Sequence, residues 1–221
     1  MKITNGFLDG PAGRLEYILN EPAGTGPRRA ALLCHPDPLR GGTMHTRIVF
    51  HAARTLAAMA VPVLRFHFRG VGQSEGQYGG GVGEIDDAFA AMHWLRHRYP
   101  VPLILGGFSF GSVVALQALA RPAIAALEIE RYVGLGLPAA FPERLPETLR
   151  WKGPKLFMSG TQDQFGTPSD LASYVDKLEE PKRIVPLEGA DHFLAGRMEE
   201  FAHLLHQHLD FESETMEECE A

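Results

Sequence analysis

Ser109 is the residue whose surroundings most clearly indicate chemistry. It is the middle residue of the pentapeptide Gly107-Phe-Ser-Phe-Gly111, which follows the apolar run beginning at Leu103 and precedes a helical pattern from Phe110 to Ala120. A serine on so tight a strand-to-helix turn is held in a strained backbone conformation that exposes its hydroxyl group. The first amides of the following helix favour an anion beside it. This context predicts a nucleophilic serine.

A plainer interpretation of the same pentapeptide is a glycine-rich turn in which Ser109 caps the following helix. The strand before the turn and the helix after it favour the nucleophile. A serine hydroxyl needs a base to take its proton. A neutral imidazole can do so near pH 7, and a buried carboxylate can hold the ring in the required tautomer and stabilise the imidazolium.

With this turn, the sequence resembles the α/β-hydrolase family, in which the serine comes first, the acid next and the histidine last. The resemblance implies Asp163, after the predicted strand 155–159, as the acid, and His192, after the predicted strand 183–186, as the base. Taken alone, Asp163 is more typical of a turn or helix cap, and His192 of a surface loop; their joint occurrence after the expected strands, in the family's order, favours the catalytic roles. Asp191 also adjoins His192, but neighbours on an extended loop point apart, so we expect Asp191 to fix the loop.

The family resemblance extends over nearly the whole chain, from about residue 1 to 209. The chain is similar to a small lidless bacterial subgroup related to dienelactone-hydrolase-like enzymes. The similarity lies in the His35-Pro36 dipeptide, the Gly41-Gly42 pair and the segment 66–76. Two departures stand out. Ser109 occupies the position where dienelactone hydrolases use cysteine, and Thr46 stands where related chains carry asparagine. Lactone hydrolysis is therefore not expected.

The resemblance also implies an oxyanion hole made of two backbone amides, that of Phe110 and one from the loop after Cys34. Prolines at positions 36 and 38 donate no hydrogen bond, which favours the Asp37 amide and leaves Leu39 in reserve. The candidate substrate-pocket side chains are apolar and lie near the three catalytic candidates in sequence: Leu39, Phe108, Phe165 and Phe193.

The elements that must position these residues alternate between strands and helices, which indicates an α/β fold with about eight mostly parallel strands. The predicted strands are an opening hairpin at 3–8 and 14–19, followed by 29–34, 62–68, 103–107, 132–137, 155–159 and 183–186. The predicted helices are 46–60, 84–98, 110–120, 169–179 and 195–209. Fewer than twenty residues separate the strand ending at Leu137 from the next one at Lys155, so no lid domain is expected.

Composition supports one hydrolase domain over residues 1–211. The chain has 221 residues and a formal net charge of −6, and its last dozen residues hold six acids and no base, so 212–221 are expected to form a disordered acidic tail. Without those six, 21 acids remain against 21 bases, which argues against nucleic acid as a partner. These six acids are Asp210, Glu212, Glu214, Glu217, Glu218 and Glu220.

Two cysteines, no signal-peptide pattern and no long apolar run indicate a cytoplasmic protein without membrane contact. The ten histidines show no His-Glu-x-x-His spacing, so no metal or other cofactor is expected.

The predicted function is that of a carboxylesterase-like serine hydrolase acting on a small acyl ester. The sequence leaves open whether the protein forms a homodimer. A thioesterase and a small-substrate peptidase would use the same residues. A binding protein that kept the hydrolase scaffold is the alternative of another class.

Overall fold

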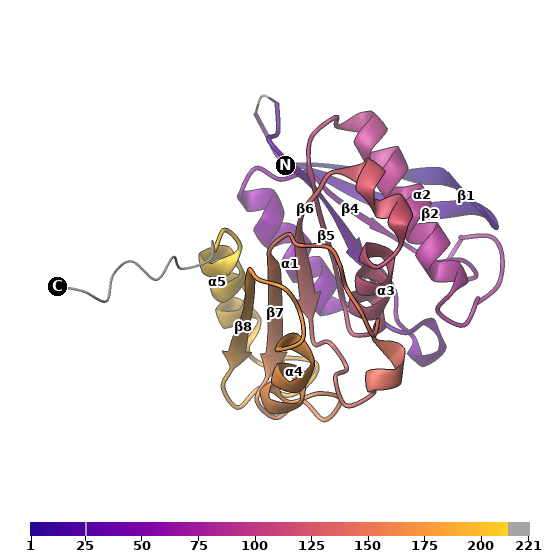
Figure 1. Ribbon diagram of the computed structural model, residues 1–221. Coiled ribbons are helices and arrows are strands. Elements are labelled where there is room, and N and C mark those ends of the chain that lie inside the picture. Colours follow the sequence, from indigo (N-terminus) through magenta and orange to yellow (C-terminus); the bar gives the residue numbers. More distant parts are fainter. Residues whose placement is uncertain (25, 212–221) are drawn as a thin grey trace.

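A sheet of eight strands in the order β1-β2-β4-β3-β5-β6-β7-β8 forms the centre of the molecule (Figure 1). The computed structural model describes residues 1–24 and 26–211. β3 to β8 run parallel to one another, so the predicted α/β-hydrolase fold class is confirmed. The strands are β1 (Lys2–Gly10), β2 (Gly13–Glu21), β3 (Ala30–Cys34), β4 (Val63–Phe66), β5 (Leu103–Phe108), β6 (Ile129–Leu135), β7 (Lys155–Gly160) and β8 (Lys182–Leu187).

The antiparallel hairpin at the start of the chain is longer than the sequence pattern predicts. β1 pairs with β2 from Lys2 opposite Glu21 to Gly10 opposite Gly13, and β2 then pairs antiparallel with β4. The outer residues of both strands are polar or half-exposed, so they lack the apolar alternation that marks a strand in sequence. Pairing along the whole hairpin extends the strands beyond that signal.

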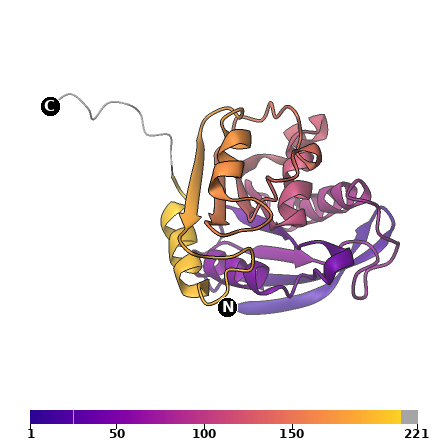
Figure 2. The same cartoon turned by 90° about the horizontal axis from the view of Figure 1, so that it is seen from below.

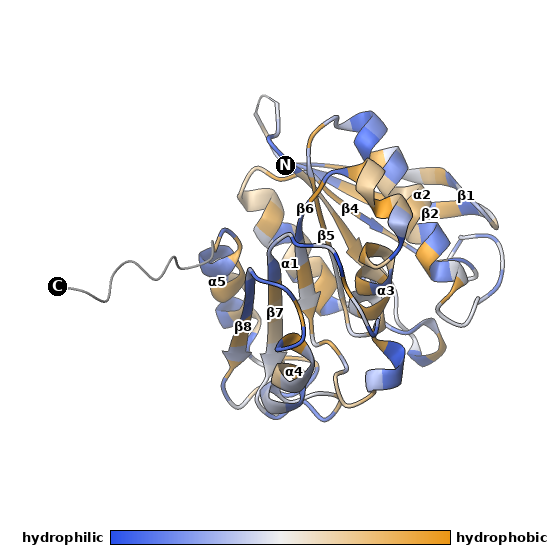
Figure 3. Ribbon diagram, viewed as in Figure 1, coloured by the Kyte–Doolittle hydropathy of each residue, from blue (hydrophilic) through white to orange (hydrophobic). Residues whose placement is uncertain are grey.

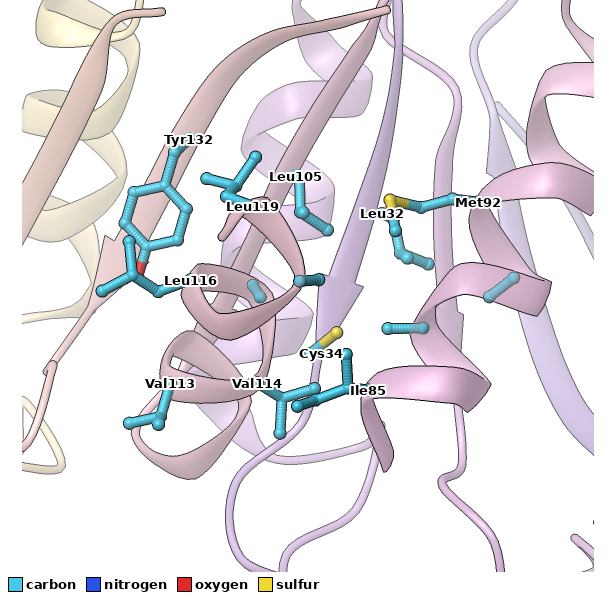
Figure 4. Packing of buried hydrophobic residues seen from close by; sticks show 14 of the residues in the cluster. Leu32, Cys34, Ile85, Met92, Leu105, Val113, Val114, Leu116, Leu119 and Tyr132 are labelled. Atoms are coloured by element: carbon cyan, nitrogen blue, oxygen red, sulfur yellow. The ribbon is translucent and has the colours of Figure 1, made fainter. Parts of the chain in front are cut away.

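Helices cover both faces of the sheet (Figures 1 and 2). One buried cluster lies between the sheet and α2, α3 and α4, and a second lies between the sheet and α1 and α5. Figure 4 shows the first cluster, in which Ile85 and Met92 of α2 and Val114 of α3 pack over Leu32 and Leu105 of the sheet. In Figure 3 the central strands are largely orange and the helices carry blue segments, as expected for amphipathic helices on a buried sheet. The helices are α1 (Arg47–Ala58), α2 (Gly83–Arg98), α3 (Phe110–Leu119), α4 (Pro168–Val175) and α5 (Met198–His208).

Three helices, α1, α4 and α5, are at least three residues shorter than predicted. α5 begins at Met198 rather than near residue 195, because Leu194 (φ 52°) and Gly196 (φ 72°) adopt left-handed backbone conformations that a right-handed helix cannot include. α4 ends at Val175 rather than at Glu179, and turns connect it to β8. The shortened end of α4 and the shortened start of α5 lie on either side of β8, the strand that leads to His192.

No lid is inserted between β6 and β7, where the described chain contains a single short helix, η3 (Pro142–Arg144). The loops after β3, β5, β7 and β8 meet at the carboxyl edge of the sheet, toward which Figure 2 looks.

The predicted tail, 212–221, lies outside the described residues. Asp210 is the first of the six acids near the end of the chain, and it lies within the described residues. Its carboxylate accepts two hydrogen bonds from Arg29, at 2.5 and 2.8 Å. None of the described helices combines the length and apolar character that a membrane span requires.

Candidate active site

Ser109 lies at the turn between β5 and α3 with φ 53° and ψ −122°, a conformation that few non-glycine residues adopt. Its N–H donates to Leu135 O at 2.9 Å, and its own carbonyl accepts from the hydroxyl of Ser112 at 2.6 Å. β6 and the first turn of α3 therefore hold the strained turn from both sides. The hydroxyl group is left to face the carboxyl edge of the sheet.

The two glycines of the pentapeptide are required by close backbone approach. A Cβ on Gly107 would lie 2.4 Å from Gly111 C, and a Cβ on Gly111 would lie 2.3 Å from Cys34 O. Both distances are far below van der Waals contact. Glycine at these positions lets α3 start immediately after β5 and against the end of β3, which brings the loop after β3 beside Ser109.

His192 connects Ser109 to Asp163. Its Nε2 lies 3.0 Å from Ser109 Oγ, and its Nδ1 lies 2.7 Å from Asp163 Oδ2. The other carboxylate oxygen of Asp163 accepts from the Phe165 N–H at 2.8 Å, which fixes the orientation of the carboxylate. Asp163 is 1% exposed and His192 3% exposed, so water screens this chain of hydrogen bonds little.

The loops that carry Asp163 and His192 are bonded to each other through their backbones. Thr161 N–H donates to Leu187 O and Gln162 N–H donates to Ala190 O, each at 3.0 Å. These bonds extend the pairing of β7 with β8 past the ends of both strands. The acid and the base therefore come from two adjacent, rigidly connected strand ends.

Asp191 has a different role in the structure from Asp163. Its Oδ1 accepts from the N–H groups of Phe193 and Ala195, at 3.1 and 3.0 Å. A carboxylate that accepts two local amides stabilises the turn after the histidine. The structure gives it no hydrogen bond to the His192 ring.

The two amides predicted for the oxyanion hole have no protein acceptor among the described residues: neither the Asp37 N–H nor the Phe110 N–H donates to another group. The Leu39 N–H, held in reserve above, donates instead to Asp37 Oδ1 at 2.9 Å. Asp37 thereby caps the short helix η1 (Pro38–Arg40). This engagement removes Leu39 and leaves Asp37 and Phe110 as the available donors.

A cleft of about 1360 Å³ contains Ser109 and His192. The four predicted pocket residues, Leu39, Phe108, Phe165 and Phe193, all line it. Phe108 and Phe165 place their rings 4.8 and 4.7 Å from the His192 ring, whereas Leu39 and Phe193 are 70% and 58% exposed at the rim. The aromatic rings therefore support the histidine as well as lining the cleft.

Glu84, which the sequence analysis did not single out, builds another wall of the cleft. Its side chain is fully buried at the start of α2, and its two carboxylate oxygens accept from Gly79 N–H at 2.7 Å and Gly81 N–H at 2.8 Å. Tyr78 and Gly81 of this loop line the cleft. The glycine run is thus tied to α2. An acid in a first helical turn carries no sequence signal of such burial.

His35 and His67, at the ends of β3 and β4, lie outside this hydrogen-bonded chain. His35 Nδ1 donates to Pro36 O at 2.7 Å and its Nε2 accepts from Phe68 N–H at 3.1 Å, while burial lowers its pKa to about 3. His67 Nδ1 lies 2.8 Å from Glu16 Oε2, and burial lowers its pKa as well. Across the described chain, no three His, Cys, Asp or Glu side chains gather closely enough to hold a metal ion.

Comparison with known proteins identifies the family of the chain. The family model described as an alpha/beta hydrolase domain matches residues 29–218. An uncharacterized protein from Rickettsia prowazekii, RP471, is 32% identical over 214 residues, covering 92% of this chain and 87% of that protein.

Two solved structures are similar over nearly their full length. An alpha-beta serine hydrolase homologue from Coxiella burnetii has a TM-score of 0.85 at 31% identity, covering 95% of this chain and 98% of that one. XC6422 from Xanthomonas campestris, a serine hydrolase without lid, has a TM-score of 0.81 at 31% identity, covering 94% and 93%. The chain belongs to the α/β-hydrolase family, in its small lidless group.

Proposed function

We propose that this protein is a carboxylesterase-like serine hydrolase that cleaves a small acyl ester, with Ser109 as nucleophile, His192 as general base and Asp163 as the orienting acid. The observation that carries the proposal is the continuous hydrogen-bonded chain from Ser109 Oγ through His192 to Asp163, at 3.0 and 2.7 Å, beside a cleft.

In the first step, His192 Nε2 takes the hydroxyl proton while Ser109 Oγ attacks the ester carbonyl. The carbonyl π electrons move to oxygen, and the resulting oxyanion is bound by the amides of Asp37 and Phe110. Collapse of this intermediate re-forms the carbonyl and breaks the bond to the leaving oxygen, which takes the proton from His192. Water then repeats the sequence on the acyl-enzyme and releases the acid.

The proposed roles of the neighbouring groups follow from their contacts. Asp163 stabilises the imidazolium and keeps the Nδ1 hydrogen directed at itself, so that Nε2 is free to accept. The positive end of α3 adds to the field at the oxyanion. Apolar rings around His192 exclude water from one side of the site.

A small apolar acyl group is favoured because the aromatic wall suits it and because no lid encloses a longer one. We propose an ester of such an acid as the first substrate class, ahead of the thioester or amide, which would react through the same acyl-enzyme. The cytoplasmic location expected from the sequence stays part of the proposal, supported by Cys34, a buried free thiol.

A fluorophosphonate probe tests the proposal, because it phosphonylates a serine only when that serine is activated. The wild-type protein should be labelled at Ser109 and should hydrolyse para-nitrophenyl esters of short acids, whereas Ser109→Ala should do neither. Ser173→Ala is a matched control, since Ser173 is an exposed serine of α4 that does not line the cleft. Folded wild-type protein that takes no label would favour the non-catalytic binding protein.

A further inference from the structure

The cleft is a groove that extends along α3 well beyond the nucleophile. Val113, Val114, Gln117 and Arg121 line it, at the spacing of residues that share one face of a helix. At about 1.5 Å of rise per residue, Gln117 lies roughly 12 Å along the helix from Ser109. A short ester would fill only the part next to the serine.

The groove changes from apolar to basic along this length. Near Ser109 its floor is formed by Val113 and Val114, which are 8% and 1% exposed. Further along, Gln117 donates from Nε2 to Arg144 O at 2.8 Å, so Arg144 lies beside Gln117 and near the end of α3 that leads to Arg121. The far end of the groove therefore presents two guanidinium groups.

The lining of the groove contains more arginines than acids, although the chain as a whole is acidic. The formal net charge of the chain is −6, whereas the charged residues that line the groove are three arginines and two acids: Arg40, Arg121, Arg144, Asp37 and Glu143. Asp86 pairs with Arg121 from outside the lining and balances its charge, so the attraction for an anion depends on an arginine whose acid partner lies farther away.

Arg144 is the guanidinium that is best placed to accept such a ligand. Arg121 already donates to Asp86 at 2.5 Å. Arg144 has a weaker ionic contact, 3.9 Å from its Nε to Glu143 Oε1, and its ring contact with Phe141 leaves the side chain 57% exposed. The planar fork of an arginine binds a carboxylate or phosphate through two parallel hydrogen bonds.

We infer that the natural substrate carries an anionic group, a carboxylate or a phosphate, on the part of the molecule that lies along α3, where Arg144 binds it. The inference rests on the proposed function and specifies its substrate class: an ester with an apolar segment next to the scissile carbonyl and a negative charge at a distance from it. The anion can belong to the acyl group or to the leaving group.

Two pairs of esters distinguish these two sources. In the first pair the acyl group differs: the para-nitrophenyl monoester of hexanedioic acid is anionic, and para-nitrophenyl hexanoate is neutral. In the second pair the leaving group differs. The anionic member is para-hydroxybenzoate whose phenol oxygen carries a hexanoyl group, and the neutral member is the same compound with its carboxylate converted to a methyl ester. The enzymes compared are the wild type, Arg144→Gln and, as a control, Arg150→Gln, which changes an exposed arginine outside the groove.

The wild type should show a higher kcat/KM for the anionic member of one pair. Arg144→Gln should lower kcat/KM for that ester alone by about three- to tenfold, mainly through KM, because an exposed ion pair contributes binding rather than chemistry. A preference for the neutral ester in both pairs, or an equal loss on all four esters, would overturn the inference while leaving the proposed function intact. If the wild type cleaved none of the four and took no fluorophosphonate label, the proposed function itself would be wrong.

Discussion

His35 and His192 are both almost completely buried near the carboxyl edge of the sheet, yet their rings face different kinds of partner. His35 is bonded to two backbone groups, the carbonyl of Pro36 and the N–H of Phe68. His192 is bonded to two side chains, the carboxylate of Asp163 and the hydroxyl of Ser109. The difference decides which of the two rings can take up a proton.

A proton on His35 Nε2 would point directly at the hydrogen of the Phe68 amide, which cannot turn away. A proton on His192 Nε2 would meet a serine oxygen, which can accept it, and the resulting positive charge would face a carboxylate. Burial and two hydrogen bonds are therefore common to His35 and to His192, the proposed base. The proposed base differs from His35 in that its two partners, Asp163 and Ser109, can accommodate either protonation state of the ring.

The sharpest way to test this comparison is to remove each ring. His192→Ala should lower kcat for an active ester by about four orders of magnitude, because among the described residues only His192 is hydrogen-bonded to Ser109 Oγ. Steady-state kinetics with para-nitrophenyl acetate, on protein whose circular dichroism matches the wild type, measure the loss. A variant that kept its rate would show that another base operates.

The second largest effect is expected from altering Asp163, whose carboxylate would stabilise a protonated His192 ring. Asp163→Asn should lower kcat by about three orders of magnitude, since an amide can donate to Nδ1 and so stabilise the wrong tautomer. The matched control is Asp191→Asn, which alters only the two local amide contacts and should cost less than about tenfold. The reverse ranking of these two variants would assign the orienting role to Asp191.

His35→Leu should instead affect stability. Removing the ring leaves the Phe68 N–H and the Pro36 carbonyl without their buried partner, which should cost about 2 to 4 kcal/mol in the free energy of unfolding. Urea unfolding at pH 7 gives this number, and kcat of the folded variant should remain within about tenfold of the wild type. A catalytic loss as large as that of His192→Ala would mean that the two rings do not differ in role.

The smallest expected effect is a pH dependence of the difference in unfolding free energy between the wild type and His35→Leu. Burial lowers the pKa of His35 from 6.5 to about 3, so between these values the unfolded chain binds a proton that the folded protein excludes. This contribution stabilises the fold fully above pH 6.5 and is lost as pH falls towards 3. The gap between wild type and His35→Leu should therefore narrow by about 1 kcal/mol from pH 7 to pH 5.5. A gap that stayed constant would indicate that His35 is charged in the folded protein.

The sequence predicts the fold well because its main signals are local. Apolar runs mark the buried parallel strands, and the family order implies which strand ends carry Asp163 and His192, which the structure brings within hydrogen-bonding distance of Ser109. The exposed hairpin and the start of α5 were less predictable, because pairing and left-handed turns there override the apolar pattern.

The far wall of the cleft could not be predicted from the sequence. It combines the glycine loop held by Glu84 of α2, Gln117 of α3 and Arg144 of the β6–β7 loop, which line one cleft only once the helices have packed on the sheet. Each of these residue types is ordinary on an exposed surface, so its place in the sequence carries no information about the groove. Substrate preference therefore depends on contacts of long sequence separation.

The left-handed turn at Ser109 also makes the nucleophile a reporter of native packing. An isolated chain would relax out of φ 53°, since a non-glycine residue keeps such a conformation only where its surroundings impose it. Here Leu135 of β6, Ser112 of α3 and the end of β3 impose it together. During gradual denaturation, reactivity of Ser109 toward a phosphonylating probe should disappear while much of the helical signal persists, so that loss of labelling marks the earliest loosening of the sheet's carboxyl edge.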